Sequence, residues 1–304
     1  HTPTPKFTYC YEVGTVFPYS TCYPLPKDRP MLNGLRKLLS DSLIVRSQNT
    51  VDGFHMAWFL LLGQFLAHLA LVYGLFRFSA ADWGVVLGLY FVGGCLGGTV
   101  TYHRLLSHKA WNAPKWWYYV GSLCGMIFLI GSPLAWSNNH RAHHRYVETE
   151  KDPHSPKFLG FASVQWFSML YTTKSFRYSL ANMNSFQLFL HRRYVALHLT
   201  YAFTLLVLGG WHTLALVYLV PSAVIWNMAS LVNTMNHTKS RFSYRNFDSS
   251  KDEAQNNLLT GYLVWGEGWH NNHHYKPAEK SFSHRWWELD IGHLVIKLLE
   301  KKSA

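Results

Sequence analysis

An apolar segment of the chain runs directly into two histidines: WGVVLGLYFVGGCLGGTVTY (residues 83–102) is followed by HRLLSH (103–108). The first part carries no Asp, Glu, Lys or Arg for 20 residues. At 1.5 Å per residue, a helix of this length crosses the roughly 30 Å hydrocarbon core of a bilayer. The segment is also rich in glycine, as membrane helices often are. We therefore expect a membrane-spanning helix that ends at a pair of imidazoles.

Other apolar segments extend this interpretation. Residues 54–76 lack charged side chains for 23 residues, and residues 194–238 lack them for 45 residues, which is too long for one span. Gly209-Gly210 near the middle of the longer segment predicts the turn of a helical hairpin. The predicted fold class is an all-α membrane protein with four transmembrane helices in two hairpins. The expected spans are 54–76, 83–102, 194–208 and 212–232.

The composition fits apolar segments separated by strongly polar ones. Hydrophobic residues make up 49% of the 304 residues and aromatic residues 16%, yet the mean hydropathy is only −0.04. The formal net charge of +12 suits either a nucleic-acid binder or a membrane protein with a basic face. With four spans the second interpretation is favoured, and no nucleic-acid partner is expected. Residues 1–50 are predicted to be a basic N-terminal segment, and residues 51–304 a single domain.

The 18 histidines are the most unusual feature of the composition. They include an HxxxxH at 103–108 and an HxxHH at both 140–144 and 270–274, while Asn233-Thr-Met-Asn-His237 closes the last span. On a helix, positions i, i+3 and i+4 share one face, so each HxxHH can aim three imidazoles at one point. Neutral imidazole suits iron, zinc, copper and nickel. Eight clustered histidines and His237 are too many for one ion, and they indicate two ions side by side.

Histidines outside these clusters carry a different expectation. A lone histidine on an apolar face is usually packed or hydrogen-bonded rather than bound to metal. We expect this of His55, His68, His198 and His212.

The histidine clusters and their surroundings resemble those of the membrane fatty-acid desaturases, most closely the Δ9 (stearoyl-type) branch. The stretches that carry the resemblance are YHRLLSH (102–108), NHRAHHR (139–145), TEKDPHSP (149–156) and GEGWHNNHH (266–274). The resemblance covers about residues 50–290 and implies two Fe2+ ions, which zinc can replace in an overexpressed sample. It also implies that Asn233 reaches one ion through water. The implied metal ligands are His103, His108, His140, His143, His144, His237, His270, His273 and His274.

The topology follows from the need to bring all implied ligands together. Every histidine cluster must then lie on one side of the membrane, within a helical cap formed by residues 103–193 and 233–304. The apolar segment 116–136 begins and ends on that side, so we expect it to lie in the interface or to dip in and return. Of the 28 Lys and Arg residues, all but Arg77 fall on the histidine side. The positive-inside rule makes that side, with both termini and the active site, cytoplasmic.

The resemblance implies an O2-dependent oxidoreductase that inserts a cis double bond, expected at Δ9, into a saturated fatty-acyl chain. Side-chain bases cannot reach the pKa of an unactivated C–H bond, so the metal must carry the hard chemistry. Two electrons must arrive in each turnover. The chain has no haem-binding His-Pro-Gly-Gly stretch, so we expect a separate donor such as ferredoxin or cytochrome b5.

Several residues near the clusters are expected to support the site. Carboxylates orient metal-bound imidazoles, and Glu267 and Asp152 are the first candidates, followed by Glu148 and Asp290. Trp136 stands where the family lines its acyl tunnel with tryptophan.

The acyl carrier is indicated by the two residues before the second cluster. Acyl-CoA enzymes of the family carry an Arg-Asp pair there, whereas this chain has Asn138-Asn139. The phosphates of CoA favour arginine or lysine at the tunnel mouth. We therefore expect an acyl chain esterified in membrane lipid to be favoured over acyl-CoA.

Two other functions stay open on the sequence alone. A related di-iron membrane hydroxylase or oxygenase would share the histidine clusters, although the context of the third cluster favours desaturation. A divalent-metal transporter would place its ligands in the middle of its spans, whereas these clusters adjoin the ends of spans.

Overall fold

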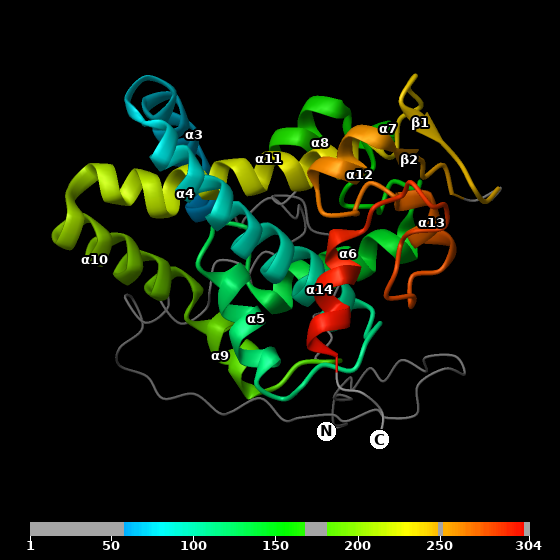
Figure 1. Cartoon of the computed structure of the whole chain (residues 1–304), viewed down its shortest axis with the longest axis horizontal. Coiled ribbons are helices and arrows are strands. Elements are labelled where there is room, and N and C mark those ends of the chain that lie inside the picture. The colour runs from blue at the N-terminus through cyan, green and yellow to red at the C-terminus, as the bar shows by residue number, and fades with distance from the viewer. Residues whose placement is uncertain (1–57, 168–180, 249–251, 301–304) are drawn as a thin grey trace, which may run out of the picture. The chain divides into compact units, whose positions relative to one another are not determined.

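Two apolar helices open the part of the chain that the structure describes (Figure 1): α3 (Trp58–Arg77), and α4 (Ala80–Tyr90) running on into the π-helix η1 (Phe91–Ser107). The structure is a computed structural model that describes residues 58–167, 181–248 and 252–300, which all belong to one unit, Gly34–Ala304. The predicted basic segment 1–50, the first residues of the first span and His55 lie outside the described residues. The helix that carries the second predicted span, 83–102, continues past residue 102 to Ser107 and so includes His103.

The chain turns sharply between α3 and α4. Ser79 caps α4: its hydroxyl accepts a hydrogen bond from the Asp82 backbone N–H at 3.2 Å, and the Asp82 carboxylate accepts one from the Ser79 N–H at 2.8 Å. This reciprocal capping box satisfies backbone donors that a helix start leaves free. The two helices therefore form a hairpin with a short turn.

A second reversal lies within α10 (Tyr194–Leu214), after which the chain runs on through η3 (Ala215–Leu219) into α11 (Val220–Met235). Gly210 has φ 68° and ψ −169°, a backbone conformation open to glycine and strained for other residues. Figure 1 shows the chain bending back on itself there. The His212 Nε2 atom lies 3.5 Å from the Asp82 carboxylate, so the tips of the two hairpins lie side by side.

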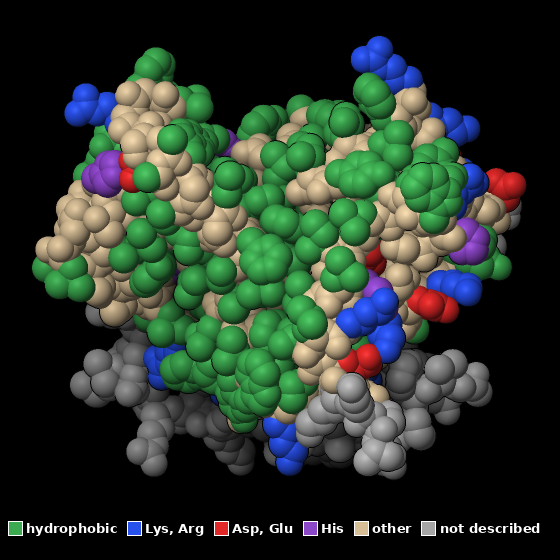
Figure 2. Space-filling model, in the orientation of Figure 1, with side chains coloured by type: hydrophobic (Ala, Val, Ile, Leu, Met, Phe, Trp, Pro, Cys, Tyr) green, Lys and Arg blue, Asp and Glu red, His purple; other side chains and the backbone are tan. Residues whose placement is uncertain are grey.

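Three helices of the described residues are long and apolar enough to cross a membrane: Phe59–Arg77, Ala80–Ser107 and the bent Tyr194–Met235, which has 42 residues. Large apolar side chains stand exposed along them, including Phe76 (82%) and Leu208 (81%). Figure 2 shows hydrophobic side chains over much of the visible face, with Lys and Arg gathered toward its edges. Exposed apolar surface of this extent marks a membrane contact. These features are those of a membrane protein, and the division of the third helix into two spans stays a prediction.

The apolar segment 116–136 is broken rather than continuous. It forms α5 (Trp117–Met126), then a turn in which Gly131 has φ 96°, and then the start of α6 (Pro133–Tyr146). Helix α5 packs closely on η1: the backbones approach so nearly at Gly97 of η1 that a Cβ there would collide with the backbone of Gly125. The indole of Trp117 also donates to the Thr101 hydroxyl at 3.1 Å. Helix α5 is therefore held against the span that carries the first histidine cluster.

Short elements complete the part of the cap that the structure describes. Strands β1 and β2 form a two-stranded antiparallel ladder in which Ser243 faces Asn257 and Tyr244 faces Asn256. An isolated bridge joins Asn256 to Trp269, just before the third histidine cluster. These elements are α7 (Pro156–Leu159), α8 (Phe161–Phe167), α9 (Ser185–Arg192), β1 (Ser243–Tyr244), β2 (Asn256–Asn257), α12 (Leu258–Leu263), α13 (His270–Tyr275) and α14 (Ile291–Leu299).

Candidate metal centre

The π-helical backbone of η1 explains how an HxxxxH can bring two imidazoles together. The His108 N–H donates to the His103 carbonyl at 3.3 Å, a hydrogen bond of the i→i+5 type. This wider turn carries residue i+5 back over residue i, and the two imidazole rings lie 5.1 Å apart between centroids. The end of the second span therefore delivers both histidines to one place.

The two HxxHH clusters lie on α6 and α13. Ser132 caps α6 by accepting a hydrogen bond from the Ala135 N–H at 3.2 Å, and Pro133 suits the first turn because it needs no backbone donor there. Helix α13 is short and is held by the asparagines between its histidines. Asn271 accepts from the backbone N–H groups of Asn246 and Phe247 at 2.9 Å.

All nine sequence-predicted histidines come together, but in two groups. Within each group the potential ligand atoms lie within 4.8 Å of one another. The five-histidine group is His103, His108, His140, His144 and His273, and the four-histidine group is His143, His237, His270 and His274.

The expectation that each HxxHH aims three imidazoles at one point is therefore wrong. On α6, His140 and His144 join the five-histidine group while His143 joins the other. The reason is helical geometry: positions i and i+4 differ by about 40° around the axis, whereas neighbours i+3 and i+4 differ by about 100°. Helix α13 splits in the same way, with His273 in one group and His270 and His274 in the other. Each cluster thus serves both groups.

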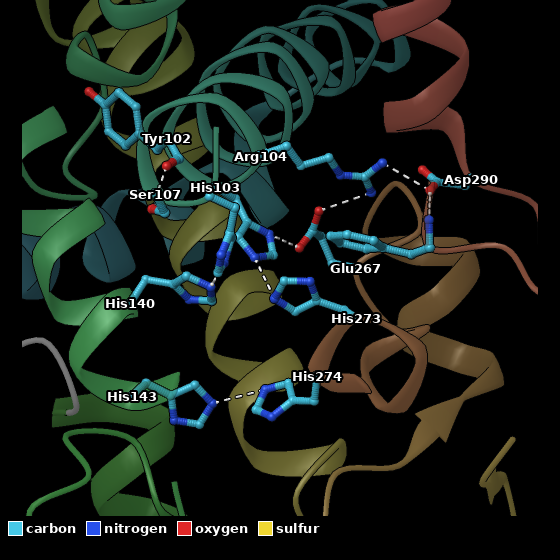
Figure 3. A network of polar contacts seen from close by, with 12 residues as sticks. Tyr102, His103, Arg104, Ser107, His140, His143, Glu267, His273, His274 and Asp290 are labelled. Atoms are coloured by element: carbon cyan, nitrogen blue, oxygen red, sulfur yellow. Dashed lines mark hydrogen bonds and ion pairs between the residues drawn. The ribbon is translucent and has the colours of Figure 1, made fainter. Parts of the chain in front are cut away.

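The two carboxylates that the sequence analysis named first, Glu267 and Asp152, each contact a histidine at Nδ1, the ring nitrogen that points away from the other histidines. The Glu267 carboxylate accepts from His103 Nδ1, and Asp152 Oδ1 accepts from His143 Nδ1 at 2.9 Å. Figure 3 shows Glu267 beside His103, and His143 facing His274. A carboxylate on Nδ1 fixes that nitrogen as the protonated one and leaves the Nε2 lone pair directed into the site.

Three more acids bear on the expectation that carboxylates support the imidazoles: Glu148 does so, Asp290 does not, and Asp252 does so although no sequence pattern indicated it. Glu148 accepts from His237 Nδ1 at 3.0 Å. Asp290 contacts none of the nine histidines; its side chain caps α14 by accepting from the His293 N–H at 2.8 Å. Asp252, which the sequence analysis did not select, accepts from His274 Nδ1 at 2.7 Å. It lies 22 residues before that histidine in a stretch with no metal-site spacing.

Arg104, inside the first cluster, was also missed. Its guanidinium is fully buried and donates to Asp290 at 2.9 Å and to Glu267 at 3.2 Å. It also lies over the Phe282 ring, 3.8 Å from the centroid. Arg104 therefore links the carboxylate behind His103 to the start of α14, as Figure 3 shows. A buried arginine is rare without paired acids, and its place between two histidines was the one signal in the sequence.

The residues fit two metal ions. His103 Nε2 and His273 Nε2 lie 3.0 Å apart, and His143 Nε2 and His274 Nε2 lie 3.2 Å apart. The Nδ1 atoms of His143 and His274 each donate a proton to a carboxylate, so their Nε2 atoms are unprotonated. The two Nε2 lone pairs point toward each other and repel unless a cation lies between them. Burial holds the pKa of both imidazoles well below the usual value, and neighbouring histidines lower it further. Neutral, convergent imidazoles are ligands for ions such as iron or zinc.

A pocket with mostly apolar walls reaches both groups. Trp136 lines it and stacks on His140, with ring centroids 5.3 Å apart and an interplanar angle of 17°. Asn233 and Asn139 also line it, whereas Asn138 is buried and donates to the Leu134 carbonyl at 2.8 Å. The other lining residues include Leu60, Tyr90, Gly94, Gly98, Ile130, Ala135, Ile225, Met228, Val232, Val264 and, from the two groups, His103, His140 and His270.

Comparison with known proteins assigns this arrangement to a family. Residues 81–302 match the profile of the fatty acid desaturases. The chain is 34% identical over 233 residues to an sn-1 stearoyl-lipid 9-desaturase of Anabaena variabilis, covering 74% of this chain and 82% of the relative. It is 31% identical to a chloroplastic palmitoyl-monogalactosyldiacylglycerol delta-7 desaturase of Arabidopsis thaliana (87% and 73% covered) and 33% identical to an acyl-CoA 5-desaturase of Anemone leveillei (84% and 79% covered). The chain belongs to the fatty acid desaturase family and is an oxidoreductase of lipid metabolism.

Proposed function

We propose that this protein is a di-iron desaturase that uses O2 to insert a cis Δ9 double bond into a saturated acyl chain carried by a membrane lipid. The observation that carries the proposal is the apolar pocket that ends at imidazoles of both histidine groups. Apolar walls bind a methylene chain and exclude water, and the imidazoles place two ions beside it. Iron and O2 would supply the oxidation, because no side-chain base reaches the pKa of a methylene C–H.

Within this proposal the protein's own residues position the chain. Trp136, stacked flat on His140, forms a rigid wall where the pocket meets the imidazoles. Ala135 and Gly131 also line the pocket, and a methyl group and a glycine leave room for the chain to bend. Asn233, also in the lining, is the residue that would hold a water on one ion.

The test is expression in a host that lacks its own desaturase, followed by fatty-acid analysis of the lipids. A new cis-9 monounsaturated acid, together with about two irons per purified chain, is the expected result. Hydroxylated or ketonic products would favour the related oxygenase function instead. A chain that holds one iron at full turnover would contradict the di-iron site.

The lipid carrier is proposed from the chemistry of the pocket and from the relatives. Asn139 lines the pocket without charge, whereas CoA carries phosphates that bind arginine and lysine. The Anabaena and Arabidopsis relatives bear the names of lipid substrates, although the Anemone relative bears that of an acyl-CoA. Purified enzyme with donor and reductant should therefore turn over labelled stearoyl-lipid bilayers faster than labelled stearoyl-CoA. Faster turnover of the CoA ester, with no acyltransferase present, contradicts the proposal.

We further propose four spans, with the metal centre, the cap and both termini on the cytoplasmic side. The adjacent hairpin tips at Asp82 and His212 support this, because they place both turns at one end of the bundle. A single cysteine placed at residue 80 or 212 should react with an impermeant thiol reagent only from outside the cell. One placed at exposed Lys151 should react only after permeabilisation. The electrons would come from a separate donor such as ferredoxin or cytochrome b5, and reconstitution with each protein in turn would distinguish them.

A further inference from the structure

The two groups of histidines differ in the charge that lies behind them. In the four-histidine group, three of the four imidazoles donate from Nδ1 to a carboxylate of their own. The pairs are His143 with Asp152 at 2.9 Å, His237 with Glu148 at 3.0 Å and His274 with Asp252 at 2.7 Å.

The five-histidine group has much less negative charge behind it. Within the described ranges, only His103 of this group hydrogen-bonds a carboxylate, that of Glu267. That carboxylate also receives the buried guanidinium of Arg104 at 3.2 Å. Arg104 also pairs with Asp290 at 2.9 Å, so the two carboxylates and the guanidinium together bring one net negative charge, whereas three carboxylates stand behind the four-histidine group. The five-histidine group is therefore supported mainly by neutral ligands.

Charge behind the ligands affects how tightly a divalent ion is held. A carboxylate on Nδ1 makes the imidazole a stronger donor at Nε2 and brings a negative charge near the ion; losing such a partner typically costs about 10–100-fold in metal affinity. The three carboxylates of the four-histidine group are little exposed, with side-chain exposure of 0% for Asp152, 8% for Glu148 and 15% for Asp252. Water therefore screens them weakly.

The five-histidine group has one more imidazole than the other group, and this additional ligand increases its affinity for metal. That imidazole is neutral and brings no charge to the site. Each additional carboxylate, in contrast, contributes a full charge to a divalent ion in a buried site. Two more carboxylates at about 10–100-fold each outweigh one neutral ligand.

We infer that the two metal positions are not equivalent. The four-histidine group holds its ion more tightly, and the five-histidine group holds the ion that exchanges first. The inference rests on the proposed function only in taking two divalent ions as the occupants.

The test follows the release of iron from the full-length chain in lipid nanodiscs, loaded under anaerobic conditions with two 57Fe2+ ions. The protein is equilibrated with rising concentrations of a chelator, and the iron that stays bound is counted per chain and followed by Mössbauer spectroscopy. We expect two steps, separated by at least tenfold in chelator concentration, with one quadrupole doublet lost in each. Release of both ions in a single step overturns the inference.

Variants assign the steps to the groups. Asp252→Asn and Asp152→Asn should move the second step about 10–100-fold toward lower chelator, and Glu267→Gln should move the first step alone. The matched control is Glu253→Gln: this acid follows Asp252 directly, is exposed and pairs with Lys157 at 3.0 Å rather than with a histidine. It should move neither step.

The assignment is overturned if Asp152→Asn or Asp252→Asn moves the first step and leaves the second in place. Size-exclusion elution and circular dichroism show that each variant is folded, and either aspartate variant alone decides the assignment. The result is also separate from the proposed function. A chain that desaturates but releases its ions together contradicts only the inference, and a chain that releases them in two steps without desaturating contradicts only the function.

Discussion

His198 of the helical bundle and His273 of the candidate metal centre are similarly buried, yet their ring nitrogens meet different partners. In the bundle, His198 (2% exposed) hydrogen-bonds the Tyr218 hydroxyl at 2.7 Å, and His68 donates to the Gln64 carbonyl at 2.7 Å. At the centre, His273 is also buried, but its Nε2 faces the Nε2 atoms of His103 and His144. Convergent lone pairs, rather than burial, distinguish a metal ligand from a structural histidine.

The largest effect should come from removing a histidine of the centre. His270→Ala deletes an imidazole whose two nitrogens have no hydrogen-bond partner among the described residues, so little besides metal binding is lost. We expect turnover to fall more than about 100-fold and bound iron to drop below two per chain. Iron counting and product analysis measure both. His237→Ala should behave alike; near-full activity in that variant would leave a site of eight histidines.

Next in size is the loss of Arg104, which supports the centre without belonging to it. Arg104→Met leaves Glu267 and Asp290 buried with no cation between them, and removing one partner of a buried ion pair costs about 3–5 kcal/mol. The unfolding temperature in detergent should fall by several degrees. Arg145→Met, which alters an exposed arginine one residue after the second cluster, is the control and should change stability little. Equal stabilities for the two variants would contradict this account.

A bundle histidine should affect stability alone. His198→Phe fills a similar space but removes the hydrogen bond to Tyr218, which is worth about 1 kcal/mol in a membrane bundle. We expect a small drop in unfolding temperature, with two irons per chain and the pattern of products unchanged. Loss of iron in this variant would show that His198 contributes to metal binding although its ring nitrogens do not face other imidazoles.

The smallest effect belongs to the hairpin tips. His212 is exposed and lies 3.5 Å from Asp82, and exposed pairs contribute about 0–1 kcal/mol. His212→Ala should therefore keep its iron, its turnover and its unfolding temperature within error of the parent chain. A clear loss of turnover would mean that the tips are coupled to the distant centre.

Much of the centre could be predicted from the sequence because its ligands come in clusters with helical spacing. The ends of the helices were harder to predict: the helix that carries the second predicted span continues five residues past residue 102, because π-helical hydrogen bonds keep the backbone bonded through the first cluster. Residues with no periodic signal, such as Asp252 and Arg104, were missed. Asp290 was assigned to an imidazole but pairs with Arg104 instead.

The apolar helices, the nine histidines that meet and the family could all be predicted from the chain alone, since these depend on local composition and spacing. Helical spacing separates His143 from His140 and His144 on α6, but the packing of the cap decides which histidines of distant segments each of them meets. The tertiary structure also decided which carboxylate stands behind which imidazole, because those partners come from distant segments and meet only when the cap is packed.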